Sequence, residues 1–228
     1  MASKKYAVLG LGRFARTLAA KLYEQGAEVI AADINSDLVE QMKESVTLAV
    51  KMDTTDPKAL IEQGIDKVDI AIVGMGDEFE PNVLTTFALK QIGVKKVIVK
   101  SAIWTRSRIL EKVGADEVIS PEKDSAERMA DKLMRPGIEE SLVLPEGHRI
   151  VQIPVPERFA GKPLAEIDAR NKYKVNIVAI LKDQNGKNKK SKGSINDIPS
   201  ADDILEAGCK LFVIGAENDI SDFMGTSK

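Results

Sequence analysis

The first 120 residues alternate short apolar runs with amphipathic segments, and this alternation limits the fold more than any other feature of the chain. The apolar runs are rich in Val, Ile and Ala, as expected for strands that are covered on both faces. They are Tyr6–Leu9, Glu28–Asp33, Thr47–Val50, Val68–Val73, Lys96–Lys100 and Glu117–Ser120. The helical segments between them are Arg13–Gln25, Ser36–Glu44, Pro57–Gln63, Val83–Gln91 and Thr105–Val113. The alternation predicts an α/β fold with a Rossmann-like, doubly wound parallel sheet.

The pattern changes after residue 120. A further helix is predicted from Pro121 to Met134, and the residues after it resemble a linker as far as His148. The remaining segments predict a strand, a helix and two more strands, at Arg149–Pro154, Pro163–Asn171, Val175–Lys182 and Lys210–Ile214. We therefore expect a nucleotide-binding domain over residues 1–134, a linker over 135–148 and a small α+β domain over 149–228. A domain of that size is marginally stable alone, so we expect it to pair or dock.

Composition excludes several classes of protein. The chain has 33 Lys and Arg against 35 Asp and Glu, so it lacks the basic character of most nucleic-acid-binding proteins. A single Cys and a single His leave too few ligands for a site of the zinc-finger type and too few groups for His- or Cys-based catalysis. No apolar run reaches the length of a membrane span, and no export signal is evident. We expect a cytoplasmic protein with no catalytic residues.

The strongest local motif is the run Gly10-Leu11-Gly12-Arg13-Phe14-Ala15, which follows the first strand and opens a helix. In this arrangement the first glycine permits a tight turn, the second lets the backbone approach a phosphate, and the third small residue keeps helix and strand close. The helix N-terminus then offers N–H groups to an anion. A glycine turn needed only for packing is the alternative interpretation.

Charged and small residues at the ends of the next strands complete a candidate dinucleotide or mononucleotide site. Asp33 ends the second strand, where a carboxylate accepts hydrogen bonds from ribose hydroxyls and repels a 2′-phosphate. Arg13 can pair with a phosphate, because a cation at a helix N-terminus is otherwise unfavourable. Asp53-Thr54-Thr55 and Gly74-Met75-Gly76 follow the third and fourth strands, although each also fits an ordinary turn.

Several motifs in order resemble the RCK (KTN) family, the cytosolic regulatory subunits of Ktr- and Trk-type bacterial potassium uptake systems. They include Gly10–Phe14 in its strand context, Ala32-Asp33-Ile34-Asn35, Leu84-Thr85-Thr86 and Ile119–Asp124. In the second domain the resemblance rests on Pro163-Leu164, Ile167-Asp168, Arg170–Tyr173 and Pro199 with Asp202–Ile204. It covers nearly the whole chain. Ala15 departs from the more common glycine, and Asp53 stands where some relatives carry an amide.

The resemblance implies roles for individual residues. Arg13 would contact the distal phosphates of ATP, and Asp33 and Asn35 the ribose and adenine region, with Ile34 between them in the binding set. Asp53 and Thr54 would belong to the loop that packs around the base. Lys100 matches a basic residue near the phosphates. Glu122 matches an acid at a dimer interface that helps hold a divalent or monovalent cation beside the nucleotide, although a first-turn helix acid would also explain it. The ligand is expected to be ATP or ADP, or NAD(H).

The resemblance also implies partners. Two chains would form a homodimer through the first domain and the helix Pro121–Met134, and dimers would build a ring, expected to be an octamer. Ligand-dependent rearrangement of this ring would gate a membrane potassium channel or transporter at the inner face of the plasma membrane. No nucleic acid is expected. A regulator of another cation transporter or antiporter shares every motif, and an NAD-dependent oxidoreductase is disfavoured by the shortage of proton donors.

Two features of the second domain have a functional and an ordinary interpretation. Arg170 and Asn171 match positions around which some relatives bind cyclic dinucleotides, but a capping or surface role is favoured here. The lysines of the segment Lys187–Lys192 fit the tip of a hairpin. A solvated loop is the favoured interpretation, and contact with anionic lipids or an acidic partner is the alternative.

Overall fold

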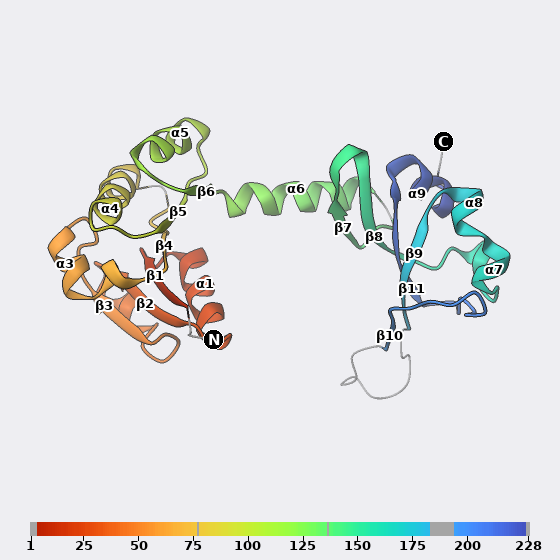
Figure 1. The fold of residues 1–228 in the computed structure, drawn as a ribbon, viewed down its shortest axis with the longest axis horizontal. Helices are drawn as coiled ribbons and strands as arrows, with labels where there is room; N and C mark the ends of the chain where they lie inside the picture. Colours follow the sequence, from red (N-terminus) through yellow and green to blue (C-terminus); the bar gives the residue numbers. More distant parts are fainter. Residues whose placement is uncertain (1–3, 77, 136, 183–193, 227–228) are drawn as a thin grey trace. The chain divides into compact units, whose positions relative to one another are not determined.

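A computed structural model describes residues 4–76, 78–135, 137–182 and 194–226. The chain divides into two compact units, Met1–Ser125 and Ala126–Lys228, which are described separately below (Figure 1). This boundary lies inside the helix α6, Pro121–Met134. The lysine-rich segment Lys187–Lys192 lies outside the described residues.

The first unit is built on a six-stranded parallel sheet in the order β3-β2-β1-β4-β5-β6. Its strands are β1 Lys5–Leu9, β2 Glu28–Asp33, β3 Leu48–Lys51, β4 Ile70–Val73, β5 Lys96–Lys100 and β6 Glu117–Ile119. Its helices are α1 Arg13–Glu24, α2 Ser36–Glu40, α3 Pro57–Glu62, α4 Phe79–Gln91 and α5 Trp104–Val113, with a 3-10 turn at Ile65–Lys67 and the start of α6. The predicted Rossmann-like, doubly wound parallel sheet is confirmed.

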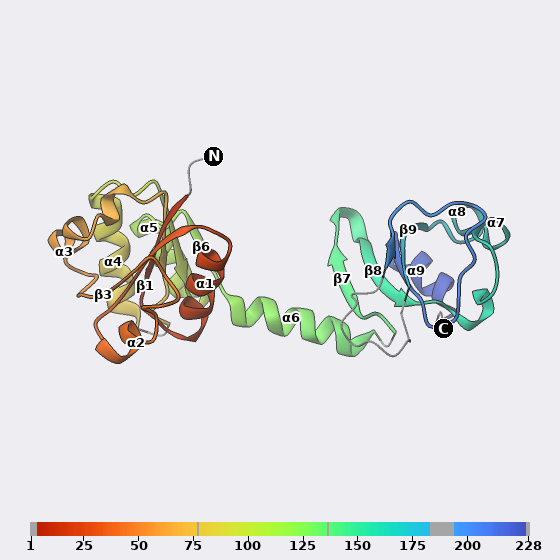
Figure 2. The same cartoon turned by 90° about the horizontal axis from the view of Figure 1, so that it is seen from below.

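Both faces of this sheet are buried, as the apolar composition of its strands requires. Ala7 and Leu9 of β1 pack with Leu60, Leu89 and Leu110 from α3, α4 and α5. The opposite face, represented by Val8, packs against Ala15 and Ala19 of α1 and Val39 of α2. Successive β1 side chains therefore enter cores on opposite faces of the sheet. The five helices form the two outer layers (Figures 1 and 2).

Two helix boundaries differ from the prediction. The helix α2 ends at Glu40, whereas the pattern predicts it to continue to Glu44, and turns cover residues 41–45 instead. The helix α4 begins at Phe79, one turn before the predicted start at Val83. Its first turn contains the acid Glu80 and Pro81, which break the apolar pattern but fit the start of a helix.

The second unit contains a five-stranded sheet in the order β10-β9-β11-β8-β7, in which every pairing is antiparallel. Its strands are β7 Glu140–Val143, β8 His148–Pro154, β9 Asn176–Leu181, β10 Ile195–Asn196 and β11 Lys210–Ala216. Its helices are α7 Leu164–Ile167, α8 Ala169–Tyr173 and α9 Glu217–Met224, with 3-10 turns at Pro145–Gly147 and Glu157–Phe159. The predicted small α+β domain is confirmed as a fold class.

The second unit corrects three expectations. Residues 135–148 are not simply a linker, because Glu140–Val143 form the edge strand β7, which pairs with β8 (Figure 2). The helix predicted over Pro163–Asn171 is two short helices, because Asp168 adopts the left-handed conformation with φ 49° and interrupts them. The helix α9 follows the last strand and was not predicted.

The contact between α1 and the end of β4 leaves no room for added atoms. A Cβ on Gly74 would lie 2.7 Å from the Cβ of Ala15 and 2.9 Å from the carbonyl oxygen of Gly10. Both distances are too short for atoms that are not bonded to each other. A glycine at position 74 thus lets α1 start close to the sheet.

This close contact predicts the effect of moving one methyl group. We expect Gly74→Ala to lower the free energy of unfolding by about 1–3 kcal/mol, the usual cost of overpacking. Adding Ala15→Gly removes the clashing methyl and should recover part of that loss, although Ala15→Gly alone destabilises. Urea unfolding followed by circular dichroism measures the coupling between the two sites. Strictly additive effects would contradict the proposed clash.

Candidate functional site

A cavity of about 850 Å³ opens at the carboxyl ends of the parallel strands in the first unit. Its walls come from the loops after β1, β2, β3, β4 and β5 and from the first turns of α1, α4 and α6. The strand order reverses at β1, between β2 and β4. Open α/β sheets bind their ligands at such a switch point.

The structure brings nearly all the predicted site residues together around this cavity. Those that line it are Gly10, Gly12, Arg13, Phe14, Asp33, Ile34, Asn35, Asp53, Thr54, Gly74, Met75, Gly76, Lys100 and Glu122. The two exceptions are Leu11 and Ala15, whose side chains are fully buried under the turn. They pack the turn from behind, so their side chains are supports rather than candidate ligand contacts.

The turn after β1 requires glycine at its first position. Gly10 has a φ of +83°, and a Cβ there would lie 2.4 Å from the Cγ of Met75. Its N–H donates to the carbonyl of Ala32 at 2.8 Å, which ties the turn to β2. Gly12 is the N-cap of α1, and no side chain caps this terminus or adds an acid to its first turn. The positive end of the α1 dipole is therefore not neutralised by an acid of α1 itself.

Asp33 is held in a fixed orientation at the edge of the cavity. One oxygen of its carboxylate accepts a hydrogen bond from the N–H of Leu11 at 2.6 Å, and the other accepts one from the N–H of Asn35 at 2.8 Å. Asn35 in turn caps α2 by accepting from the N–H of Asp37 at 2.9 Å. Asp33 thus joins the glycine-rich turn to the end of β2.

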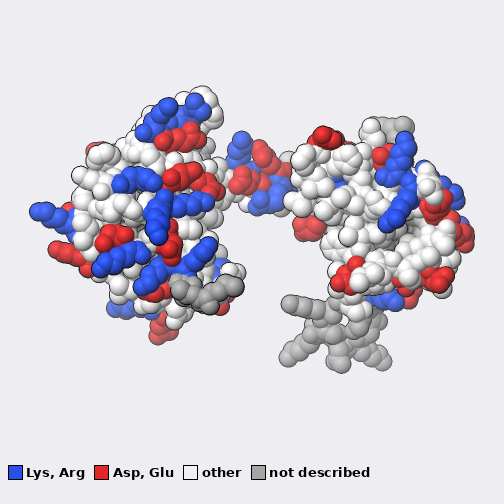
Figure 3. All heavy atoms as spheres, viewed as in Figure 1, with Lys and Arg blue, Asp and Glu red and all other residues white. Residues whose placement is uncertain are grey.

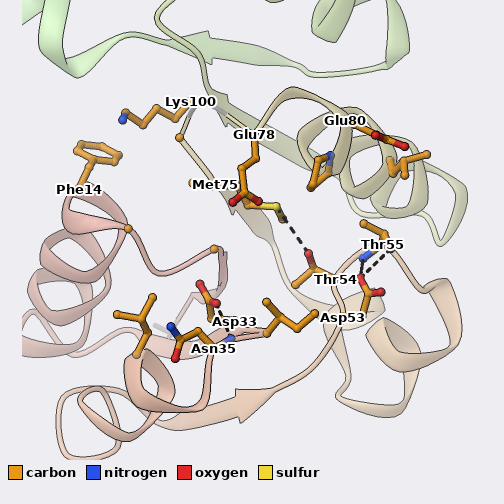
Figure 4. A pocket seen from close by; sticks show the side chains of 18 of the residues that line it. Phe14, Asp33, Asn35, Asp53, Thr54, Thr55, Met75, Glu78, Glu80 and Lys100 are labelled. Atoms are coloured by element: carbon orange, nitrogen blue, oxygen red, sulfur yellow. Dashed lines mark hydrogen bonds between the residues drawn. The ribbon is translucent and has the colours of Figure 1, made fainter.

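The loop after β3 forms the wall opposite Phe14 and Lys100 (Figure 4). The Oδ1 of Asp53 accepts hydrogen bonds from both the hydroxyl and the N–H of Thr55, at 2.7 and 2.9 Å. These bonds hold the pKa of the Asp53 carboxyl below its ordinary value, so the group is ionised at neutral pH. The hydroxyl of Thr54 meets that of Thr85 on α4 at 3.0 Å, which anchors the loop.

Lys100 and Glu122 form an ion pair in the cavity wall, with 2.6 Å between Nζ and Oε1. The Lys100 side chain is only 16% exposed, whereas that of Glu122 is 58% exposed. The hydrogen bond from Lys100 holds the pKa of the Glu122 carboxyl below its ordinary value. Lys100 is thus partly shielded from water and already engaged with a carboxylate.

Sequence reasoning missed part of the lining. Thr55 belongs to the predicted run Asp53-Thr54-Thr55. The lining residues that were not predicted are Leu38, Met52, Glu78, Glu80, Pro81 and Leu84. The signal that could have revealed Glu78 and Glu80 was an acidic pair before a proline, which marks the first turn of a helix. With these two acids, the described residues that line the cavity supply five carboxylates, from Asp33, Asp53, Glu78, Glu80 and Glu122, against the two cations Arg13 and Lys100.

The described residues that line the cavity include no His, Cys or Tyr. Within the described part of the chain, no three His, Cys, Asp or Glu residues are grouped so that they could hold a metal ion. The cation role of Glu122 stays a prediction.

Other features of the sequence lie away from this cavity. Asn171 donates its amide to the carboxylate of Asp168 at 2.7 Å, which fits the local role favoured for it. His148, the single histidine, begins β8 and is exposed, whereas Cys209 is buried, as expected. Among the described residues, no helix combines the length and apolar character needed to cross a bilayer.

Comparison with protein families matches both halves of the chain. Residues 6–121 match the TrkA-N domain, and residues 148–225 match the TrkA-C domain. The Ktr system potassium uptake protein C of Bacillus subtilis (strain 168) is 37% identical over 220 residues, which cover 96% of each chain. The Ktr system potassium uptake protein A of the same organism is 31% identical over 221 residues, covering 97% of this chain and 96% of the relative.

Solved structures show the same fold. The GsuK channel bound to NAD aligns with a TM-score of 0.54 and 24% identity over 99% of this chain. The crystal structure of the GsuK RCK domain aligns with a TM-score of 0.51 and 23% identity over 98% of this chain. This chain spans 39% of the first and 46% of the second, so each comparison concerns part of a longer protein.

The Lys100–Glu122 pair predicts a change in titration. Because the pKa of Glu122 is depressed by Lys100, the pair stabilises the fold above the unfolded pKa of Glu122, and this stabilisation is lost as pH falls through the folded pKa. We expect Lys100→Met to raise the Glu122 pKa, measured by carbon NMR of the carboxyl group. The matched control is Lys96→Met, which removes the Lys96–Glu117 pair from the same strand. An unchanged Glu122 pKa in Lys100→Met would contradict the assignment.

Proposed function

Because this chain belongs to the family of Ktr and Trk potassium uptake proteins that join a TrkA-N to a TrkA-C domain, we propose that it is a nucleotide-sensing regulatory subunit of a potassium uptake system. It binds ATP or ADP, or NAD(H), and acts by changing shape rather than by catalysis. The single observation that carries this proposal is the cavity at the switch point. There an uncapped helix N-terminus and Arg13 face one part of a ligand while Asp33 faces another.

The adenosine half of the ligand occupies the side of the cavity formed by β2 and β3. Asp33 accepts hydrogen bonds from the ribose hydroxyls, and Ile34 and Asn35 line the same side. Asp53 and Thr54 border the base. The ionised Asp53 is an acceptor only, so it suits a base edge that presents an amino group. An acid at position 33 disfavours a ligand with a 2′-phosphate.

The phosphates lie over the turn Gly10–Ala15, at the N-terminus of α1. The backbone N–H groups and the helix dipole attract the proximal phosphates. Arg13 contacts the distal phosphates through charge-assisted hydrogen bonds, and Lys100 approaches them from β5. The segment Gly74–Gly76 closes the other side.

Glu122 helps to hold a divalent or monovalent cation beside the phosphates. In the described chain its carboxylate is bound to Lys100 alone among the cations that line the cavity. The net acidic lining supports this role, since five carboxylates of the described residues line a cavity proposed to hold an anionic ligand. A cation between Glu122 and the phosphates relieves that repulsion.

Regulation requires that the ligands differ in affinity for two shapes of the assembly, because equal affinity shifts no equilibrium. Two chains form a dimer, and dimers form a ring, which we assign as an octamer. Residues 1–134 bind the nucleotide, and the second domain, from residue 149 onwards, pairs with a second copy. The ring lies at the cytoplasmic face of the membrane, bound to a separate potassium-conducting subunit. The terminal phosphate that Arg13 reaches distinguishes ATP from ADP.

Arg13 provides a direct test of phosphate recognition. We expect Arg13→Gln to weaken ATP binding about 10- to 100-fold, because a charge-assisted hydrogen bond contributes about 1.5–3 kcal/mol. Binding of adenosine should be nearly unchanged. Isothermal titration with ATP, ADP, NADH and adenosine measures these differences. Arg16→Gln is the matched control, since Arg16 lies on the same helix but does not line the cavity. Equal losses for ATP and adenosine would contradict the assignment.

The regulatory role is tested by ion flux. With its membrane partner in lipid vesicles, the chain should change potassium flux by several-fold between saturating ATP and ADP, and Arg13→Gln should abolish the difference. Light scattering should show an assembly well above the 24.8 kDa of one chain. A monomer would contradict the ring. Equal effects on sodium and potassium flux would favour a regulator of another cation transporter, and turnover of NADH would favour an oxidoreductase.

A further inference from the structure

The helix α6 is not held by burial of its side chains. None of its residues from Pro121 to Met134 is buried, and its apolar side chains Met129, Leu133 and Met134 are 56–78% exposed. Charged side chains of both signs cover its visible face (Figure 3). What fixes the helix within a single chain must therefore be polar.

The C-terminal end of α6 is joined to the second unit by four charged residues. The Asp131 carboxylate accepts from Nη1 of Arg135 at 2.7 Å and from Nη1 of Arg149 at 3.0 Å. The Glu217 carboxylate accepts from Nε and Nη2 of Arg135 at 2.9 and 2.7 Å, and its Oε2 lies 3.4 Å from Nε of Arg149. Each arginine thus bridges both carboxylates, which closes the cluster into a ring. We name these four residues the α6 clamp.

The clamp connects elements that are far apart in the sequence. Asp131 lies on α6, Arg135 just after it, Arg149 on β8 and Glu217 at the start of α9. Arg135 and Glu217 are separated by 82 residues. All four belong to the second compact unit, which begins at Ala126. The C-terminal half of α6 is therefore part of that unit rather than a connection between units.

The clamp differs from an ordinary surface ion pair. Exposed pairs contribute little, because water screens the charges and two flexible side chains must be ordered for one contact. In the clamp each charged group meets two partners, so one ordered side chain makes two contacts. The Arg149 side chain is only 11% exposed, which limits screening. Hydrogen bonds from Arg149 and Arg135 to Asp131, and from Arg135 to Glu217, hold the pKa values of both carboxyls below their ordinary range.

The segment after α6 would otherwise be the natural joint. Gly137 has a φ of +92°, and a turn closes there with the N–H of Ile138 donating to the carbonyl of Arg135 at 3.1 Å. The clamp bridges this turn, because Asp131 before it and Arg149 after it are bonded directly. A joint at residues 135–137 would have to break the contacts of Asp131 and Arg135.

We propose that the α6 clamp makes the C-terminal half of α6 and the second unit one rigid body, so that the chain does not bend at residues 135–137. The inference concerns a single chain and holds whether or not the proposed nucleotide binds. The alternative is a joint at residues 135–137, with α6 moving together with the first unit.

Distance distributions between spin labels test this rigid body. Nitroxide labels on cysteines at Lys132 and Lys172 report within it, and labels at Lys132 and Glu44 report between α6 and the first unit. Labelled protein is mixed with excess unlabelled chain, so that only distances within one chain contribute. The buried Cys209 stays in place, and its background labelling is measured in the unmodified protein. Double electron–electron resonance should give a narrow distribution for 132–172, whatever the width for 132–44. A broad distribution for 132–172 together with a narrow one for 132–44 would overturn the proposal.

Variants test the clamp itself. Glu217→Gln keeps the size of the side chain and removes its charge, and it should broaden the 132–172 distribution. Arg149→Met should broaden it further, by about twofold or more in width. The control is Lys210→Met, which removes the 2.7 Å Lys210–Glu139 ion pair from the same unit without touching α6. If Arg149→Met unfolds the second unit, which would be seen as the loss of its thermal transition, the width of the 132–172 distribution in Glu217→Gln tests the proposal instead. Widths that are the same in Glu217→Gln and in the unchanged chain would overturn the proposal.

Discussion

The first unit depends on the close approach of α1 to the end of the sheet. Gly10, Gly74 and Ala15 meet there, and a Cβ at either glycine would overlap neighbouring atoms. Because no side chain larger than that of glycine fits at positions 10 and 74, α1 can begin immediately after the turn. Its N-terminus faces the cavity without a capping side chain. The same turn donates the Leu11 N–H to Asp33, which sets the carboxylate at the end of β2. One packing constraint thus places both the positive and the negative parts of the site.

The charges of the cavity have consequences for any anionic ligand. Among the described residues, five carboxylates and two cations line it, and one of the cations, Lys100, is already paired with Glu122. On the proposed function, a phosphate that attracts Lys100 competes with the Glu122 carboxylate, whereas a cation bound with the phosphate lets both contacts persist. The feature that favours phosphates is the local arrangement around the N-terminus of α1 rather than the net charge of the described lining.

The sequence predicted those parts of the molecule that local rules govern. Strands that are covered on both faces appear in the sequence as apolar runs, so the parallel sheet was predictable. The glycines of the turn after the first strand have a characteristic spacing, so most of the cavity lining was predictable as well. The edge strand β7 was not, because Leu142 and Val143 are both exposed and give no alternating pattern. Glu78 and Glu80 were missed because polar first turns interrupt the helical period. The α6 clamp joins residues up to 86 positions apart, from Asp131 to Glu217, and no local pattern encodes such a contact.

The helix α6 links the two arrangements of charge. Glu122 lies in the cavity wall and Asp131 in the clamp, nine residues apart on one uninterrupted helix, a rise of about 13.5 Å at 1.5 Å per residue. An uninterrupted helix resists stretching, because its backbone hydrogen bonds are intrahelical. On the proposal that the clamp fixes the C-terminal half of α6 to the second unit, a displacement of the helix at Glu122 passes along α6 to the clamp and is not absorbed in the turn at Gly137.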